Sequence, residues 1–578
     1  MFGNYIIWVT SNGYEQYLYS YVSPIDPSVQ LTRPVMQITK SLTAVLGLAS
    51  STFAFDPREA TIASTHHDLY TGLFTCREVV ESFLARIEAL NNHTNAILAI
   101  NPDVLRDADN CDKALASNNG THGALFGIPI LLKDNFDTSF MPTTGANAAM
   151  EFSQPTVDAP SVAAFKKAGA IILGKTNLHE LALEGISVSS LGGQTINPYD
   201  YTRTPGGSSG GTGAAIAASF SVFGTGTDTV NSLRSPASAN SLWSMRPTRG
   251  LVSRAGVIPI SYTQDTIGPI ARCVEDVATA ITVMSSIGYD ADDNTTASVP
   301  AGIEGTDYAA SLTTGSLKGL RLGLLEGFFN RTASNETTPV NDAMAKHVAK
   351  LRNAGATIVP INETIYNASA IIGALDVQRY EYREELTKYL ERPDLAGTHP
   401  NSTTELYASD NFLVLPSGYE YVTTSLVSST SNATYNSTLA GIRDLSLSLE
   451  KTFASNNLDA LIYPEQNNLV VKIGSPSQVG RNGILAALTG TPVVTVPIGF
   501  SPATKTAPDG VPIGMEIMGR QWTEEKLLQI AYQIQQMGRV RKTPSWAKEQ
   551  VTAKRYDAVP SVTPNVDNIP EEYPIGVL

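Results

Sequence analysis

The sequence is poor in the residues from which disulfide scaffolds and metal centres are built. Its 578 residues include only three cysteines and seven histidines, and no C-x-x-C or His-rich spacing indicates a zinc site. We therefore expect no metal and no cofactor. Charged residues make up only 16% of the chain and hydrophobic residues 42%. This balance excludes a disordered protein and predicts a large core.

Features of nucleic-acid-binding and membrane-spanning proteins are also missing. The formal net charge is −14 and no cluster of Lys or Arg interrupts the acidic composition, so phosphate backbones are poor partners. No hydrophobic run approaches the roughly 20 residues that cross a bilayer. We therefore expect no nucleic-acid partner and no stable membrane insertion, and the composition favours a globular enzyme.

Residues 1–54 predict an N-terminal extension that carries a signal-peptide-like segment at 36–54. That segment reads MQITKSLTAVLGLASSTFA, with one basic residue, a short apolar stretch and small residues at a cleavage position before Phe55. Residues 1–35 are then an upstream misassigned start or an unfolded extension. The alternative is that 36–54 form an apolar helix packed on the domain.

Glycosylation sequons support the same interpretation, because N-linked glycans need exposed loops in a secreted protein. None falls between residues 122 and 293, a gap that fits a buried central block. We therefore predict an extracellular glycoprotein that leaves the cell through the secretory pathway. The asparagines in N-x-S/T are Asn92, Asn119, Asn294, Asn330, Asn335, Asn362, Asn367, Asn401, Asn432 and Asn436.

Helical and strand patterns alternate from residue 55 onward. Thr75 and Glu78 form a capping box ahead of apolar residues at helical spacing. The alternation predicts an α/β sheet with helices on both faces, in one domain over 55–545 with a Pro-rich surface tail at 546–578. We interpret the polar stretches 287–318 and 395–440 as surface insertions. Strands are expected at 127–133, 170–173, 320–325, 357–361, 458–463, 493–498 and 513–518, and helices at 162–168, 342–353 and 524–537.

A Gly/Ser block, PGGSSGGTG at 205–213, is the most distinctive motif. It runs straight into an Ala-rich helix, which disfavours a flexible linker, and it has no Lys, which disfavours a phosphate loop. It also satisfies the G-x-S-x-G elbow of α/β-hydrolases, which needs a downstream histidine. The downstream histidines, His347 and His399, lie in polar stretches where solvated positions are expected, so the elbow is disfavoured.

A serine without histidine needs another base, and a lysine can serve if burial lowers its pKa. Lys133 fits, because it ends the predicted buried strand GIPILLK at 127–133. The alternative is an ordinary surface lysine.

Together these residues resemble the amidase signature family, whose blocks appear in order between about residues 60 and 540. The resemblance implies a single large α/β/α domain around a mixed sheet of about eleven strands with helices on both faces. The matching blocks are GIPILLKD at 127–134, GKTN at 174–177, PGGSSGG at 205–211, GTD at 226–228, SLR at 232–234, and Pro259, Asp265 and Gly268-Pro269.

The same resemblance implies a serine hydrolase that cleaves carboxylic amides through an acyl-enzyme. Lys133 would be the base, Ser208 the bridging residue held by a cis peptide, and Ser232 the nucleophile. The expected partner is a small-molecule amide. Amidotransferase subunits of the family serve tRNA, and we discount that function for a secreted chain.

Residues around the nucleophile have supporting roles by the same resemblance. Backbone N–H groups of the loop 229–232, which holds Thr229, Val230, Asn231 and Ser232, would form an oxyanion hole. Asp228 and Arg234 flank Ser232, and we expect them to form a structural charge pair that holds the loop.

One departure concerns Val230-Asn231, where the family commonly has Gly-Gly. A β-branched residue tolerates positive φ poorly, so Val230 must occupy an ordinary backbone region or the loop is reshaped. Three outcomes stay open: an amidase for a restricted acyl group, an esterase or acyltransferase, and an inactive secreted binding protein.

The remaining candidates have structural interpretations. His179 lies at a helix start and Cys273 at a helical core position. Cys76 and Cys111 lie in predicted N-terminal helices, where they either pair in an oxidising compartment or remain free buried thiols.

Overall fold

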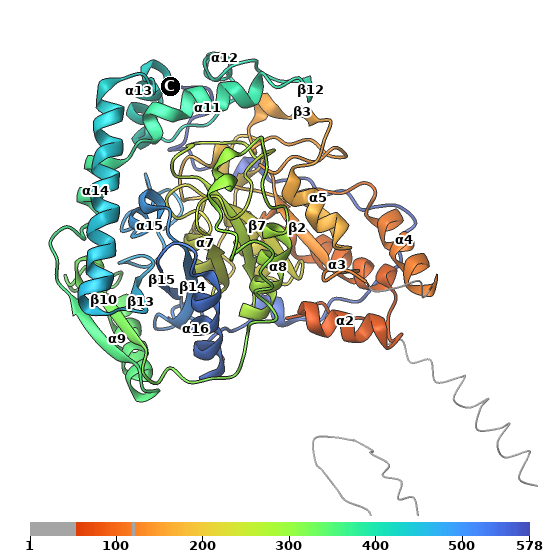
Figure 1. Ribbon diagram of the computed structural model, residues 1–578. Coiled ribbons are helices and arrows are strands. Elements are labelled where there is room, and N and C mark those ends of the chain that lie inside the picture. The colour runs from red at the N-terminus through yellow and green to blue at the C-terminus, as the bar shows by residue number, and fades with distance from the viewer. Residues whose placement is uncertain (1–53, 118–121) are drawn as a thin grey trace, which may run out of the picture. The chain divides into compact units, whose positions relative to one another are not determined.

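A mixed eleven-stranded sheet organises the chain (Figure 1), in the order β1-β4-β2-β7-β9-β8-β14-β15-β13-β10-β11. The computed structural model describes residues 54–117 and 122–578; the predicted signal-like segment, apart from Ala54, and Asn119 lie outside them. Strands β4, β2 and β7 are parallel neighbours, whereas β9, β8, β14 and β15 pair antiparallel. The strands are β1 (Ile97–Ile100), β2 (Pro129–Lys133), β4 (Ile171–Thr176), β7 (Phe223–Asp228), β8 (Trp243–Arg246), β9 (Thr266–Ala271), β10 (Arg321–Leu325), β11 (Thr357–Ile361), β13 (Ala460–Pro464), β14 (Val493–Phe500) and β15 (Pro512–Met518).

Helices cover both faces of this sheet, as alternate residues of β9 demonstrate. Ile267 packs in the main hydrophobic cluster with Ile281 of α8, whereas Ile270 packs in a separate cluster with Ile216 of α6. Because successive strand side chains point to opposite faces, Ile267 and Ile270, three residues apart, point to opposite sides of the sheet. The predicted α/β/α domain with a mixed sheet is confirmed. The principal helices are α2 (Ile62–Tyr70), α3 (Cys76–Leu90), α4 (Val104–Ser117), α5 (Pro160–Lys167), α6 (Gly210–Ala217), α7 (Arg234–Ala239), α8 (Val274–Ser285), α9 (Thr338–Asn353), α10 (Ala368–Leu375), α11 (Gln378–Leu390), α12 (Thr403–Ala408), α13 (Tyr419–Val427), α14 (Ala433–Asn456), α15 (Ile484–Thr489) and α16 (Glu524–Gln536).

The predicted helix start at Thr75 is confirmed. The Thr75 side chain accepts from the Glu78 backbone N–H at the start of α3, and the Glu78 carboxylate accepts from the Thr75 N–H. Beside it, Cys76 and Cys111 of α4 form a disulfide, so of the two alternatives pairing is the correct one. Cys273 is free.

Two expectations about polar stretches are wrong. Segment 395–440 is not a surface insertion, because Leu406, Phe412 and Val414 are buried in a cluster with α11. Its Ser and Thr residues dilute the apolar positions, but Leu406 on α12 and Phe412 and Val414 in the irregular segment after it still turn inward. His347 is buried rather than solvated, with 3% of its surface exposed, whereas His399 is half-buried.

The described part of the tail after residue 545 contains only 3₁₀ turns and extended segments: η7 (Ser545–Lys548) and η8 (Val566–Asn568), with no strand of the main sheet. Asn565 and Asn568 of this tail bond to Asn95 and Gln194. Among the described residues, no helix is both long enough and apolar enough to pass through a bilayer.

Candidate active site

Lys133 lies at the end of β2, between the parallel strands β4 and β7, and its side chain is inaccessible to solvent. Its Nζ donates to Ser208 Oγ at 2.8 Å and to Thr227 Oγ1 at 2.7 Å. Burial lowers the pKa of Lys133 to about 7, against the attraction of Asp228 and Asp265 for the ammonium form. The lysine is therefore a hydrogen-bonded amine that can be neutral near physiological pH.

Ser208 lies in the Gly/Ser block just before α6, and the Gly207–Ser208 peptide bond is cis. Its carbonyl accepts from the His179 backbone N–H at 3.0 Å. Glycine is required nearby for two reasons. Gly206 has a φ of +70°, and a Cβ on Gly211 would lie 2.1 Å from the Asn177 carbonyl oxygen. The block is thus a tightly packed turn.

Ser232 lies on the loop 229–232, between β7 and α7, and lines a cavity of about 200 Å³. Its carbonyl accepts from the Ser209 N–H at 3.3 Å, which joins this loop to the Gly/Ser block. Lys133 and Ser208 lie fully buried, whereas Ser232 is 8% exposed. Of the three predicted residues, the structure thus joins Lys133 to Ser208 directly and places Ser232 on the adjoining cavity wall.

Each carbonyl oxygen of the loop 229–232 accepts a hydrogen bond from a donor on another residue of the protein. Their donors are Gln264 Nε2 for Thr229, Arg234 Nη2 for Val230, the Arg234 and Ser235 N–H groups for Asn231, and Ser209 N–H for Ser232. Because a trans peptide is planar, the held carbonyls of residues 229–231 direct the N–H groups of residues 230–232 the opposite way, and the Asp228 carbonyl, held by Arg246 Nη1, does the same for the Thr229 N–H. Within the described chain, the N–H groups of residues 229–232 have no protein acceptor, and these residues line the cavity.

A buried ion cluster, defined as Asp228, Arg234, Arg246, Glu465 and Glu516, lies behind the loop. Arg234 binds Asp228 through two contacts of 3.0 Å and Glu516 through one of 2.9 Å. Arg246 Nη1 donates to Asp228 Oδ1 at 2.7 Å. Asp228, Arg234, Arg246 and Glu516 have no exposed surface, so these contacts are shielded from solvent screening.

The Val230-Asn231 pair is accommodated without positive φ at either residue. Asn231 Nδ2 donates to Glu465 Oε1 at 3.0 Å, and Val230 packs on a hydrophobic cluster that includes Ile484 of α15. Gly483 makes room, because a Cβ there would lie 2.2 Å from the Val230 oxygen. The loop therefore keeps an ordinary backbone with two side chains where the family commonly has none.

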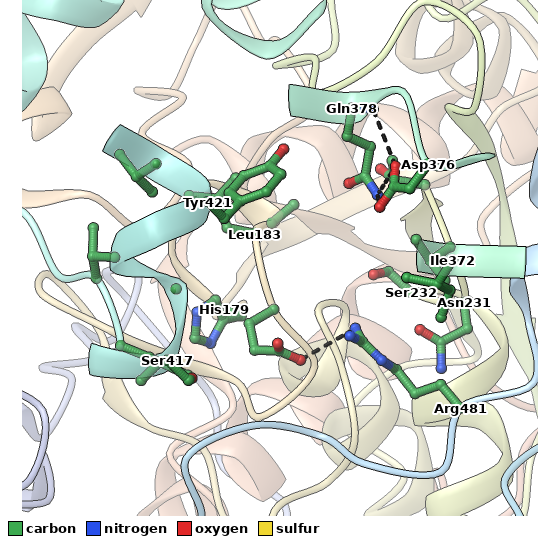
Figure 2. Close-up of a pocket in the computed structure, with 18 of the residues that line it drawn as sticks. His179, Leu183, Asn231, Ser232, Ile372, Asp376, Gln378, Ser417, Tyr421 and Arg481 are labelled. Atoms are coloured by element: carbon green, nitrogen blue, oxygen red, sulfur yellow. Dashed lines mark hydrogen bonds and ion pairs between the residues drawn. The ribbon is translucent and has the colours of Figure 1, made fainter. Parts of the chain in front are cut away.

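Figure 2 shows the residues that line the cavity, several of which the sequence did not indicate as site residues. His179 and Tyr421 lie across the cavity from Ser232, while Asp376 and Arg481 flank Ser232. Arg481 pairs with Glu184 at 3.2 Å, and burial lowers the pKa of His179 to about 3, so this histidine is neutral. These residues come from separate segments with no shared motif. The described residues include no group of three or more His, Cys, Asp or Glu that could hold a metal.

We expect Asp228→Asn to destabilise the protein by about 3–5 kcal/mol, because it leaves two buried guanidinium groups without their shared counter-ion. Urea denaturation measures the loss. Asp444→Asn, on the exposed face of α14, is the matched control and should change stability by less than about 0.5 kcal/mol. Equal stability of the two variants would contradict a structural role for the cluster.

Comparisons with known proteins agree with this architecture. The model of the Amidase family matches residues 78–528. A component of the glutamyl-tRNA(Gln) amidotransferase of Acinetobacter baumannii is 33% identical over 493 residues, covering 80% of this chain and 93% of its own. The solved peptide amidase of Stenotrophomonas maltophilia is 32% identical with a TM-score of 0.74, covering 84% of this chain and 98% of its own. An amidase family protein of Bacillus anthracis is 26% identical with a TM-score of 0.72, covering 90% and 95%. The chain therefore belongs to the amidase signature family and is an amidase, a hydrolase of carbon–nitrogen bonds.

Proposed function

We propose that the chain cleaves carboxylic amides as a serine hydrolase through Lys133, Ser208 and Ser232 and an acyl-enzyme. The observation that carries this proposal is the 2.8 Å contact between the Lys133 amine and the Ser208 hydroxyl, both of which are fully buried. A neutral amine in this position accepts a proton from a serine without any imidazole. Of the three residues, Ser232 is the one that lines the cavity, where substrate can reach its hydroxyl.

Proton transfer runs along the three residues in this proposal. Ser232 Oγ attacks the amide carbonyl carbon while its proton passes to Ser208 and the Ser208 proton passes to Lys133. Collapse of the tetrahedral intermediate breaks the C–N bond, and Ser208 protonates the leaving nitrogen as Lys133 returns its proton. Water then attacks the acyl-enzyme by the same relay and releases the acid.

Free N–H groups of the loop 229–232 supply the oxyanion hole in this mechanism. They are held before substrate arrives, because the protein binds the carbonyls of the same peptides. Donors that are already oriented stabilise the developing charge without reorganisation, and one such donor is worth about 100- to 1000-fold in rate.

Small polar amides are the substrate class that the cavity supports best. Its volume of about 200 Å³ and its mixture of polar and apolar walls suit a compact acyl group. Because the chain is similar to a peptide amidase, peptide amides are the first substrates to test. The panel also includes aryl amides and esters, and amides with hydroxylamine added as the acceptor of the acyl group.

Ser232→Ala is expected to lower kcat at least about a thousand-fold on the best amide of this panel, because it removes the attacking oxygen. It should also abolish labelling by a fluorophosphonate probe. Ser209→Ala, which changes the serine that follows Ser208 in the chain, is the control and should retain labelling. Undiminished turnover by Ser232→Ala would contradict the assignment.

The pH dependence follows from the proton on Lys133. Because the base must be neutral, we expect kcat/KM to rise with pH through about 7 and to fall about tenfold per unit below it. Asp265→Asn removes a charge that favours the ammonium form, so its acid limb should move to lower pH. A limb that stays in place in this variant would contradict the assignment to Lys133.

We also propose export through the secretory pathway, supported by the disulfide of Cys76 and Cys111. Every sequon asparagine in the described chain is exposed. Protein made in a secreting eukaryotic host should begin at Phe55, lose mass on endoglycosidase treatment and show one titratable thiol before reduction. A chain that retains residues 1–54 and carries no glycan would contradict this proposal.

A further inference from the structure

Glu465 is a buried acid that the proposed reaction does not use. It directly follows β13, is 1% exposed, and accepts from Asn231 Nδ2 through Oε1. Its second oxygen, Oε2, has no hydrogen-bond partner in the described structure, whereas Glu516 accepts from Arg234 and has the Tyr463 hydroxyl beside its carboxyl group. A buried carboxyl oxygen without a partner needs an explanation, because an unpaired buried acceptor is costly.

Sheet register brings the two acids together. β13 and β15 are antiparallel, with Tyr463 opposite Glu516, and the Glu465 N–H donates to the Gly514 carbonyl. Glu465 is therefore the diagonal neighbour of Glu516 on one sheet face, a position within reach of long side chains. Gly514, directly opposite, has no side chain to separate them.

The charge balance of the buried ion cluster requires a proton. Three carboxyl groups, on Asp228, Glu465 and Glu516, face two guanidinium groups, on Arg234 and Arg246. Lys133 faces Asp228 from β2, but it must be neutral to act as a base, and Tyr463 on β13 adds no positive charge. One uncompensated negative charge in a buried cluster is unfavourable enough that one of the three carboxyl groups keeps its proton.

We propose that Glu465 carries this proton, shares it with Glu516, and as a neutral group positions Asn231 and the backbone of the loop 229–232. Glu465 Oε2–H donates to Glu516 Oε1, while Glu465 Oε1 accepts from Asn231. The proposal rests on the proposed function, in which that loop binds the oxyanion. Glu465 is a positioning residue, since it acts through Asn231.

Ionisation of Glu465 would oppose catalysis in two ways. It would place a new negative charge behind the loop that must stabilise an oxyanion, and it would set two carboxylates against each other beside Asn231. Burial, followed by the charge of Glu516, raises the pKa of Glu465 to about 8. The pKa of Glu516 is also raised by burial.

The test compares kcat and KM against pH for the wild type, Glu465→Gln and Glu516→Gln. Wild-type kcat should fall above pH about 8 and reach about one tenth of its plateau at pH about 9. Both variants should lose this alkaline limb, because either change leaves two carboxylates to balance two guanidinium groups. Glu524→Gln replaces a buried acid that binds Thr248 elsewhere, and it should keep the limb.

An alkaline limb that persists in Glu465→Gln would overturn the proposal, as would its absence from the wild type. Asn231→Ala supplies a further check, since the amide is the link to the loop. It should lower kcat more than it changes KM, and adding Glu465→Gln to it should cause no further change in the pH profile. Additive effects on the profile would show that Glu465 acts by another route.

A stability measurement separates failure of this proposal from failure of the proposed function, because it needs no turnover. A raised pKa means that the folded state holds a proton that the unfolded state releases, so stability falls as pH rises from about 4.5 to about 8. The wild type should therefore lose thermal stability relative to Glu465→Gln across this range. A difference independent of pH would overturn the proposal even if Ser232 proves to be the nucleophile. If Glu465→Gln does not fold, Glu516→Gln against the wild type decides in the same way.

Discussion

Removal of the Lys133 side chain from water is the constraint on which the rest of the site depends. An ammonium group in this position loses its hydration, so burial lowers the pKa of Lys133 to about 7, while two hydroxyl partners at 2.7 and 2.8 Å fix the position of its nitrogen. The position is set by the parallel strands β4 and β7 on either side of β2. In the proposed mechanism the sheet therefore supplies the base, in place of a histidine.

The buried ion cluster extends this constraint to the neighbouring loop. Arg234 links Asp228 at the end of β7 to Glu516 in β15 and also holds the Val230 carbonyl. This arrangement orients peptide N–H groups toward the cavity without the flexibility of a Gly-Gly pair. Asn231 and Gly483 complete it, one by bonding to Glu465 and the other by leaving space. Where the sequence departs from the family pattern, the loop thus packs the side chains of Val230 and Asn231 and keeps an ordinary backbone.

Sequence reasoning predicted the strand of Lys133 and the Gly/Ser block well, since both depend on local pattern: a buried apolar run and glycines that permit close approach. It failed for residues 395–440 and His347, where polar composition concealed buried positions. It could not identify Tyr421, Asp376 or Arg481 as neighbours of Ser232. Those residues lie far apart along the chain and meet only after folding.

The sequence by itself determined the fold class, the family and the residue types available for catalysis, because alternation of apolar segments and short glycine-rich blocks are local properties. Only the tertiary structure decided which groups lose their water and which charges lack a counter-ion. The pKa of Lys133, the free N–H groups of the loop 229–232 and the excess carboxyl group behind it all arise from contacts between distant segments. Burial and charge balance are properties of the assembled core, so no stretch of the chain carries them alone.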